Sequence, residues 1–330
     1  MSEVSEIVQR LLEPHSYPAV LATLVDIEGS SYRRRGARLL HPACGGTVGS
    51  ISGGCLEEDL LARATSLLQN ERASGDLVTY DTTAENDLVW GVGLGCHGIV
   101  RVLLEKLSEP PAWVEPSRIA LNQRRNFTLR VSWAPESASR GTELLTESAD
   151  TSAPAPGIFD HLIVPRLHLV IFGAGDDAAP LARLAADLDW QVTLTDPRSS
   201  KATAERFPTA QRVFAAPPES APAEVAWDDR TVAVVMTHHY RYDVPLLKVL
   251  GRLHLPYLGL LGPRDRGERI LIDAELVDQP PPHLHAPIGL DLGGDGATAV
   301  ALAVVAEIQA VMHERTATSL RHRAEPIHAR

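Results

Sequence analysis

A cysteine follows a run of glycine and serine in the sequence GSISGGCLEEDL, residues 49–60. Gly53 and Gly54 can adopt backbone conformations that other residues avoid, so this stretch can form a loop whose N–H groups converge on an anion. Cys55 falls near the N-cap of the helix that follows, which lowers the pKa of a thiol, whereas the three carboxylates of residues 57–59 oppose that shift. The sequence leaves two interpretations open: a thiol that contacts a ligand, and a small buried cysteine in a capped turn.

A second glycine-rich stretch, WGVGLGCHG at residues 90–98, surrounds Cys96 and His97. A thiolate–imidazolium pair requires the two side chains to meet, but neighbouring residues on a strand point apart. We therefore do not expect a catalytic dyad at this position.

Four arginines lie within GSSYRRRGARLL, residues 29–40, in a chain that is acidic overall. The guanidinium group suits phosphate or a carboxylate-bearing partner surface. Arg34 and Arg38 are accordingly predicted to contact an anionic ligand, and the alternative is a solvated turn.

Gly173, Gly175 and Ala178 form the pattern G-x-G-x-x-A between an apolar run, LHLVIFGAG, and a helical one. In a dinucleotide-binding fold the first glycine permits a tight turn, the second lets a phosphate approach the backbone, and the small third residue keeps helix and strand close. The helix N-terminus adds free N–H groups for the phosphate. Asp196 ends the next predicted strand, where a carboxylate can bind ribose hydroxyls. The glycine pattern and Asp196 together are typical of a domain that binds a nucleotide or dinucleotide.

Two further loops are expected at the same edge of that sheet, where ligands bind in open α/β folds. MTHHYRYD supplies His238, which can bind phosphate or a metal, and LLGPRDRGER supplies Arg264. Asp176 and Asp177, directly after the glycines, place negative charge where a pyrophosphate would lie. A structural Rossmann domain with an altered ligand therefore stays open as the alternative.

The elements that position these residues predict an α/β protein, with an N-terminal mixed α/β domain and a C-terminal Rossmann-like doubly wound parallel sheet. In the first half, strands are predicted at residues 17–27 and in DLVTYDTT, GIVRVLLEKL and NFTLRVSW, with an amphipathic helix from Leu56 onward. In the second half, strands and helices alternate. Few large apolar residues occur in 134–158, which indicates a linker or long loop. The expected divisions are a domain at 1–133, a linker at 134–165 and a domain at 166–330.

The composition excludes several function classes. The chain has 330 residues, with 31 basic and 42 acidic side chains and a net charge of −11, which argues against general nucleic-acid binding. The N-terminus lacks the basic start and apolar core of a signal peptide, and the longest apolar run, ATAVALAVVA, is too short to span a bilayer. We expect a cytoplasmic protein without membrane contact. The three cysteines fit neither a disulfide framework nor a zinc finger.

Taken together, these motifs resemble the XdhC/CoxI family, the accessory proteins of xanthine dehydrogenase and related molybdenum hydroxylases. GSSYRRRGARLL matches the family motif G-S-S-P-R-x-x-G-A-x-M except at Tyr32 and Leu39. GSISGGC followed by Glu57 matches the family loop G-S-I-S-G-G-C-x-E, and GLGCHG carries His97 where the family has glycine. In the second half, the glycine fingerprint, VVMTHHYRYD, YLGLLGPRDR and PIGLDLGG are similar to the Rossmann signatures of the family.

The resemblance implies that the protein binds molybdenum cofactor (molybdopterin) as cargo, protects it and hands it to an apo-enzyme, a molybdenum hydroxylase of the xanthine dehydrogenase type. It also implies contact with a cysteine desulfurase that sulfurates the cofactor, and an accessory role rather than catalysis. A homodimer is expected by base rate. The residues expected to bind the cofactor or a nucleotide are Cys55, Cys96, Gly53, Gly54, Arg34, Arg38, Gly173, Gly175, Asp196, His238 and Arg264.

Two other functions fit parts of the sequence. An NAD(P)-dependent oxidoreductase would use the Rossmann half, with His238 as the acid or base beside the hydride donor. A nucleotide-sensing scaffold would use the same half only to bind partners.

Overall fold

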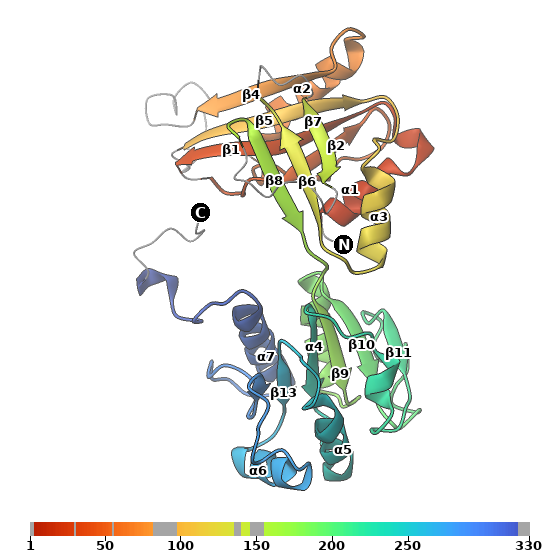
Figure 1. Cartoon of the computed structure of the whole chain (residues 1–330), viewed down its shortest axis with the longest axis vertical. Helices are drawn as coiled ribbons and strands as arrows, with labels where there is room; N and C mark the ends of the chain where they lie inside the picture. The colour runs from red at the N-terminus through yellow and green to blue at the C-terminus, as the bar shows by residue number, and fades with distance from the viewer. Residues whose placement is uncertain are drawn as a thin grey trace. The chain divides into compact units, whose positions relative to one another are not determined.

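The computed structural model describes residues 3–29, 31–54, 56–81, 98–134, 140–145 and 155–322. The chain divides into two compact units, Met1–Pro165 and Arg166–Arg330. Figure 1 shows the helices and strands of both.

The first unit is built on a five-stranded antiparallel sheet with the strand order β3-β2-β1-β5-β4. The central strand has a nearly continuous apolar sequence, AVLATLV, and its first seven residues are buried on both faces of the sheet. The strands are β1 (Ala19–Gly29), β2 (Arg38–Pro42), β3 (Val48–Gly49), β4 (Gly75–Asp81) and β5 (Gly98–Leu107).

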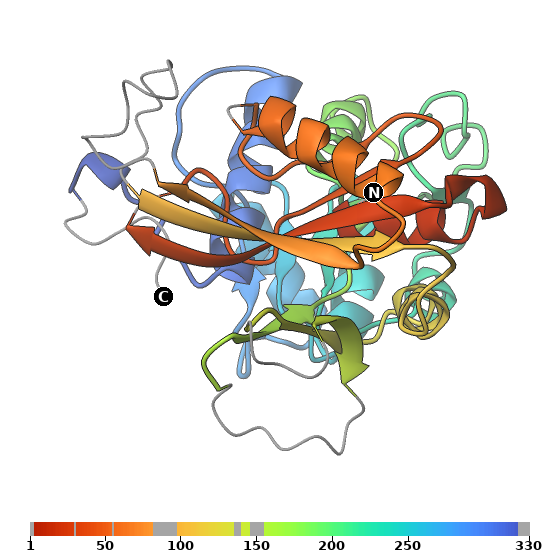
Figure 2. The same ribbon diagram turned by 90° about the horizontal axis from the view of Figure 1, so that it is seen from above.

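Each face of this sheet is covered by a different layer, as Figure 2 shows. On one face lies α2 (Glu57–Gln69), which buries Leu60, Ala64 and Leu67 because these residues share one side of the helix. On the other face lie the remaining two helices and the second sheet of the unit. These elements are α1 (Glu3–Leu11), a 3-10 turn η1 (Pro14–Ser16), α3 (Val114–Asn122), β6 (Phe127–Ser132), β7 (Gly141–Leu145) and β8 (Ile158–Ile163).

The segment expected to be a linker, 134–165, belongs to the first unit and carries two of its strands. Both β7 and β8 pair with β6 in antiparallel register, in the order β7-β6-β8. The linker prediction is therefore wrong for the described part of this segment. The apolar strand β8, IFDHLI, lies at the end of the segment, after the stretch that has few large apolar residues, and both strands are short and mostly half buried.

The second unit is a six-stranded parallel sheet with the order β11-β10-β9-β12-β13-β14 and helices on both faces. This arrangement confirms the predicted Rossmann-like, doubly wound α/β fold. The strands are β9 (His168–Phe172), β10 (Gln191–Thr195), β11 (Arg212–Phe214), β12 (Thr231–Val235), β13 (Leu258–Leu260) and β14 (Leu284–His285).

Two apolar cores fill the faces of the parallel sheet. The helices α4 (Ala178–Asp187) and α7 (Ala297–Met312) pack on one face, and α5 (Tyr240–Leu250) and α6 (Arg264–Asp273) pack on the other. Short 3-10 turns occur at η2 (Ala221–Glu224) and η3 (Leu320–His322). No helix in the described ranges is long and apolar enough to cross a membrane.

The strand order fixes where a ligand site can form in the second unit. The chain leaves β9 for β10 on one side and places β12 on the other side, so the connections after β9 and β12 diverge. Such a divergence opens a crevice at the carboxyl ends of the strands. The loops that carry Gly173 and His238 therefore meet at this edge.

Candidate functional site

The glycine loop of the first unit folds around the side chain of Glu57. Five backbone N–H groups donate to its carboxylate, at 2.8 to 3.2 Å. The hydroxyls of Ser50 (2.8 Å) and Ser52 also donate to it. The backbone donors are those of Ile51, Ser52, Gly53, Gly54 and Leu56.

These hydrogen bonds hold Glu57 in its charged form. Burial disfavours the carboxylate, but the hydroxyl and backbone donors of Ser52, the hydroxyl of Ser50 and the amide of Gly54 outweigh it and lower the pKa of Glu57 to about 2. The loop is thus an N–H nest of the predicted kind, but the anion inside it is a carboxylate of the same chain.

This changes the role predicted for Gly53 and Gly54. Their N–H groups are directed at Glu57, so they do not offer a vacant anion site. Both residues are exposed, with φ of 80° and 124°. Cys55 and Cys96 lie outside the described residues, as does His97.

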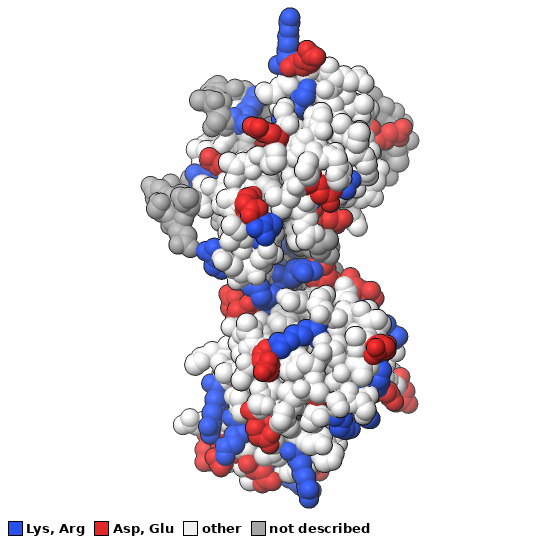
Figure 3. All heavy atoms as spheres, turned by 90° about the vertical axis from the view of Figure 1, so that its right-hand side faces the viewer, with Lys and Arg blue, Asp and Glu red and all other residues white. Residues whose placement is uncertain are grey.

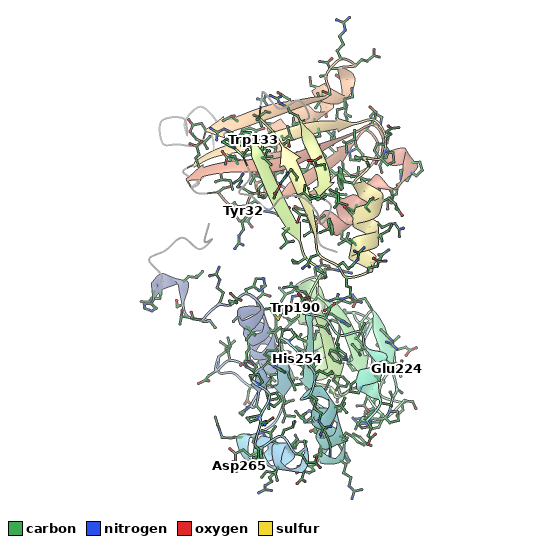
Figure 4. The ribbon with its side chains drawn as sticks, in the orientation of Figure 1. Tyr32, Trp133, Trp190, Glu224, His254 and Asp265 are labelled. Atoms are coloured by element: carbon green, nitrogen blue, oxygen red, sulfur yellow. The ribbon has the colours of Figure 1, made fainter. Side chains whose placement is uncertain are left out.

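An exposed aromatic ring lies against this loop. Tyr32, labelled in Figure 4, is 70 % exposed, and a Cβ on Gly53 would lie 2.7 Å from its ring carbon Cε1. A Cβ on Gly54 would have no atom within 4 Å. The loop therefore presents an aromatic face on one side of Gly53 and open space beside Gly54.

The arginines of residues 33–38 do not form a single anion-binding fork. Arg34 is exposed, whereas Arg38 is fully buried in β2. Arg33 pairs with Glu3 at 2.5 Å, and Arg35 donates to the carbonyl of Val25 at 2.7 Å. The prediction that Arg38 contacts an anionic ligand is therefore wrong, because its side chain is buried in the protein interior and does not reach the solvent.

Arg38 instead belongs to a polar cluster inside the first unit. Its Nη1 donates to the carbonyl of Gly36 (3.1 Å) and to Nδ1 of His161 (2.7 Å). Burial lowers the pKa of Arg38 to about 10, although Glu105 and Glu3 favour its charge. Burial, and then the charge of Arg38, lower the pKa of His161 to about 4, so this histidine is a neutral acceptor near pH 7. The cluster joins β2 to β8 and is structural.

In the second unit, the side chain of Asp196 accepts a hydrogen bond from the backbone of the glycine loop. The carboxylate is 1 % exposed and accepts hydrogen bonds from the backbone of Ala174 (2.8 Å) and from Nε and Nη2 of Arg198 (2.7 and 2.6 Å). Burial opposes its charge, but Arg198 and the Ala174 amide lower its pKa. Asp196 therefore does not have the open position predicted for binding ribose, because Arg198 occupies both of its oxygens.

The approach to Gly175 is occupied by a second carboxylate of the chain. Oδ1 of Asp177 would lie 2.4 Å from a Cβ on Gly175, and His238 Cδ2 would lie 3.6 Å from that Cβ. Asp177 Oδ2 and His238 Nε2 are 2.6 Å apart. The structure thus brings the predicted residues Gly175 and His238 together, through an aspartate that was predicted only to repel a pyrophosphate. Gly173 makes the tight turn, with φ of 125°.

Arg264 does not join this group. It is the first residue of α6 and is exposed, whereas the neighbouring Arg266 pairs with the buried carboxylate of Asp243.

No cluster of metal-binding side chains occurs among the described residues. On the face in Figure 3, acidic and basic side chains are intermixed.

Sequence reasoning missed the roles of Glu57, Asp177 and Arg198. Each lies within four residues of a predicted site residue. This closeness in the sequence was the signal that could have identified them. The sequence does not show that a side chain folds back into the loop that precedes it, or that Arg198 covers the aspartate two positions before it.

Two family models match the chain. The model described as the XdhC and CoxI family matches residues 15–81, which include the Glu57 loop, and the model described as the XdhC Rossmann domain matches residues 169–308. They cover the Glu57 loop of the first unit and the glycine loop of the second.

Relatives align with most of the chain. A Bacillus subtilis protein named as a probable subunit of xanthine dehydrogenase is 36 % identical over 88 % of this chain and 92 % of its own length. The Escherichia coli "Molybdenum cofactor insertion chaperone PaoD" is 27 % identical over 89 % of this chain and 83 % of its own. A crystal structure described as a xanthine dehydrogenase from Bacillus halodurans superposes with a TM-score of 0.81 at 29 % identity, covering 97 % of this chain and 98 % of that one.

Proposed function

Since the chain belongs to the XdhC and CoxI family, we propose that it is a molybdenum cofactor chaperone. It binds the cofactor as cargo, protects it, assists its sulfuration by a cysteine desulfurase and passes it to a molybdenum hydroxylase of the xanthine dehydrogenase type. The relationship over 89 % of this chain to a relative named as an insertion chaperone supports this proposal.

The observation that carries the proposal is the loop built on Glu57. Its carboxylate binds the amides of Gly54 and Leu56, which flank position 55, so the backbone on both sides of Cys55 is fixed. Gly53 and Gly54 are exposed beside it. A thiol is a soft ligand suited to a molybdenum centre or its terminal sulfur. We propose that the loop presents Cys55 to the metal end of the cofactor.

The oxidoreductase alternative gains no support from the second unit. A dinucleotide requires its pyrophosphate to approach the second glycine of the fingerprint. Here the carboxylate of Asp177 occupies the approach to Gly175, whereas the charge of the neighbouring Asp176 is paired with Arg206 at 2.7 Å. The negative charge of Asp177 repels a pyrophosphate at this position. We therefore assign no hydride transfer to His238.

Replacing Cys55 by alanine is expected to weaken cofactor retention while leaving the folded protein intact. Alanine removes the soft ligand but leaves the backbone, and with it the hydrogen bonds to Glu57. The measurement is molybdenum and pterin retained per folded molecule after gel filtration with isolated cofactor. Cys44, which is exposed and outside the loop, is the matched control, and Cys44→Ala should retain cofactor like the wild type.

The opposite pattern would identify Cys55 as a packing residue. In that case Cys55→Ala would lose several kcal/mol of unfolding free energy, about the size expected for a core defect, while retention per folded molecule stayed unchanged.

A further inference from the structure

Tyr32 is the one aromatic side chain in the described ranges that is exposed to solvent, because the other Phe, Tyr and Trp residues there are buried or half-buried. It is 70 % exposed and lies beside the Glu57 loop of the first unit (Figure 4). Single apolar groups are common at protein surfaces, so exposure alone does not identify a ligand contact. The packing around the ring decides whether it is positioned to contact a ligand.

The ring of Tyr32 packs against backbone that only a glycine allows. A Cβ on Gly53 would lie 2.7 Å from Cε1 and 3.0 Å from Cδ1 of this ring, well inside the contact distance of about 3.5 Å between carbon atoms. The N–H group of Gly53 donates to Glu57 at 3.1 Å, so this backbone segment is fixed. Gly53 therefore makes room for the ring, and the ring has a defined position on the loop.

The chain that carries Tyr32 is also fixed. The next residue, Arg33, pairs with Glu3 of α1 at 2.5 Å, and Arg35 donates to the carbonyl of Val25 in β1 at 2.7 Å. The exposure of the ring is thus a property of an anchored segment. A contact surface that is already ordered loses less conformational entropy when a ligand binds.

The surface beside the ring is a strip of glycine backbone. Gly53 and Gly54 are exposed, and a Cβ on Gly54 would have no atom within 4 Å. The N–H groups of both glycines are directed at Glu57, so the strip offers few donors to a phosphate. An aromatic face next to a strip without side chains favours a flat ring as the ligand group, and it disfavours an anion.

We propose that Tyr32 stacks on the pterin ring system of the cofactor. This assignment rests on the proposed function, in which position 55 faces the metal end. Gly53 and position 55 are two residues apart, which span at most about 7 Å. In the cofactor the dithiolene belongs to a ring fused to the pterin, whereas a nucleotide is attached farther along, through the phosphate. The pterin is therefore the flat group within reach of Tyr32.

The dissociation constant of isolated molybdenum cofactor from full-length Tyr32→Phe and Tyr32→Leu tests this assignment. Phenylalanine keeps the ring face and should bind like the wild type. Leucine keeps an apolar side chain without that face and should bind at least about tenfold more weakly, as expected for the loss of a stacked ring. Both variants should unfold at the wild-type temperature, because the side chain is exposed. Tyr240→Leu in the second unit is the control and should bind like the wild type.

Binding of 6-hydroxymethylpterin, followed by its fluorescence, separates the ring contact from the metal contact. Pterin binding that is kept in Tyr32→Phe and weakened in Tyr32→Leu supports stacking, even if no cofactor is retained, and only the chaperone function is then contradicted. Cofactor binding that is equal in wild type and Tyr32→Leu would overturn stacking and leave the chaperone function intact. An equal loss in both variants would also overturn it, since the hydroxyl and not the ring would then be required. A wild type that binds neither ligand contradicts both proposals.

Discussion

Glu57→Ala is expected to lower the free energy of unfolding of the first unit by about 3 kcal/mol, because removing a charged acceptor leaves several donors of one loop without a partner. The orphaned groups include the amides of Ile51, which is buried, and Ser52. The midpoint of thermal or denaturant unfolding measures the loss. Cofactor retention should fall with it, since the backbone beside position 55 is no longer fixed.

Glu58→Ala is the matched control, because Glu58 is the neighbouring carboxylate in the chain and accepts none of the hydrogen bonds that hold Glu57 in the loop. It should change the unfolding free energy by less than about 0.5 kcal/mol. Equal losses for the two variants would contradict the role assigned to Glu57.

The same carboxylate predicts a pH dependence. Its pKa is about 2 in the folded protein against an ordinary 4.5, so the unfolded chain binds the proton more readily. The stabilisation is fully present above about pH 4.5 and is lost as the pH falls toward 2. The stability difference between wild type and Glu57→Gln should shrink over this window. A difference that stays constant from neutral pH to pH 2 would contradict a charged Glu57.

Gly173→Ala is expected to destabilise the second unit by more than about 4 kcal/mol. The added Cβ would lie 2.6 Å from the carbonyl carbon of Met236 and 2.8 Å from the backbone nitrogen of Thr237, so two strand ends would have to separate. The φ of 125° also disfavours any residue with a side chain. Thermal unfolding of the purified variant measures the effect.

The matched control for Gly173 is Gly267→Ala in α6, where the added Cβ would meet Ala286 Cβ at an ordinary 3.7 Å. This variant should be neutral or slightly more stable, since alanine favours a helix by about 1 kcal/mol over glycine. If Gly173→Ala melted at the same temperature as Gly267→Ala, the close approach of the β9 and β12 ends would be disproved.

The sequence predicted the fold wherever burial produces a clear apolar pattern. The central strand was expected at 17–27 and lies at Ala19–Gly29, and the helix expected from Leu56 begins at Glu57. The strands β7 and β8 were missed because most of their residues are half buried, with no regular alternation of buried and exposed positions. A strand without that alternation has no strong periodic signal.

The candidate site was predictable in position but less so in chemistry. The glycines marked both loops, yet each loop contains a carboxylate of its own chain, Glu57 in the first unit and Asp177 in the second. A glycine-rich loop shows that something approaches the backbone closely, and it does not show whether that group comes from a ligand or from the chain. Arg38 was misassigned for a related reason, because sequence does not distinguish an exposed arginine from a buried one paired within the core.

Incubation of the full-length protein with isolated molybdenum cofactor, followed by gel filtration and analysis of the protein peak for molybdenum and pterin, tests the central claim most directly. The account predicts that both elute with the wild-type protein and that both decrease for Cys55→Ala but not for Cys44→Ala. A wild-type protein peak that contains neither molybdenum nor pterin would contradict the chaperone function.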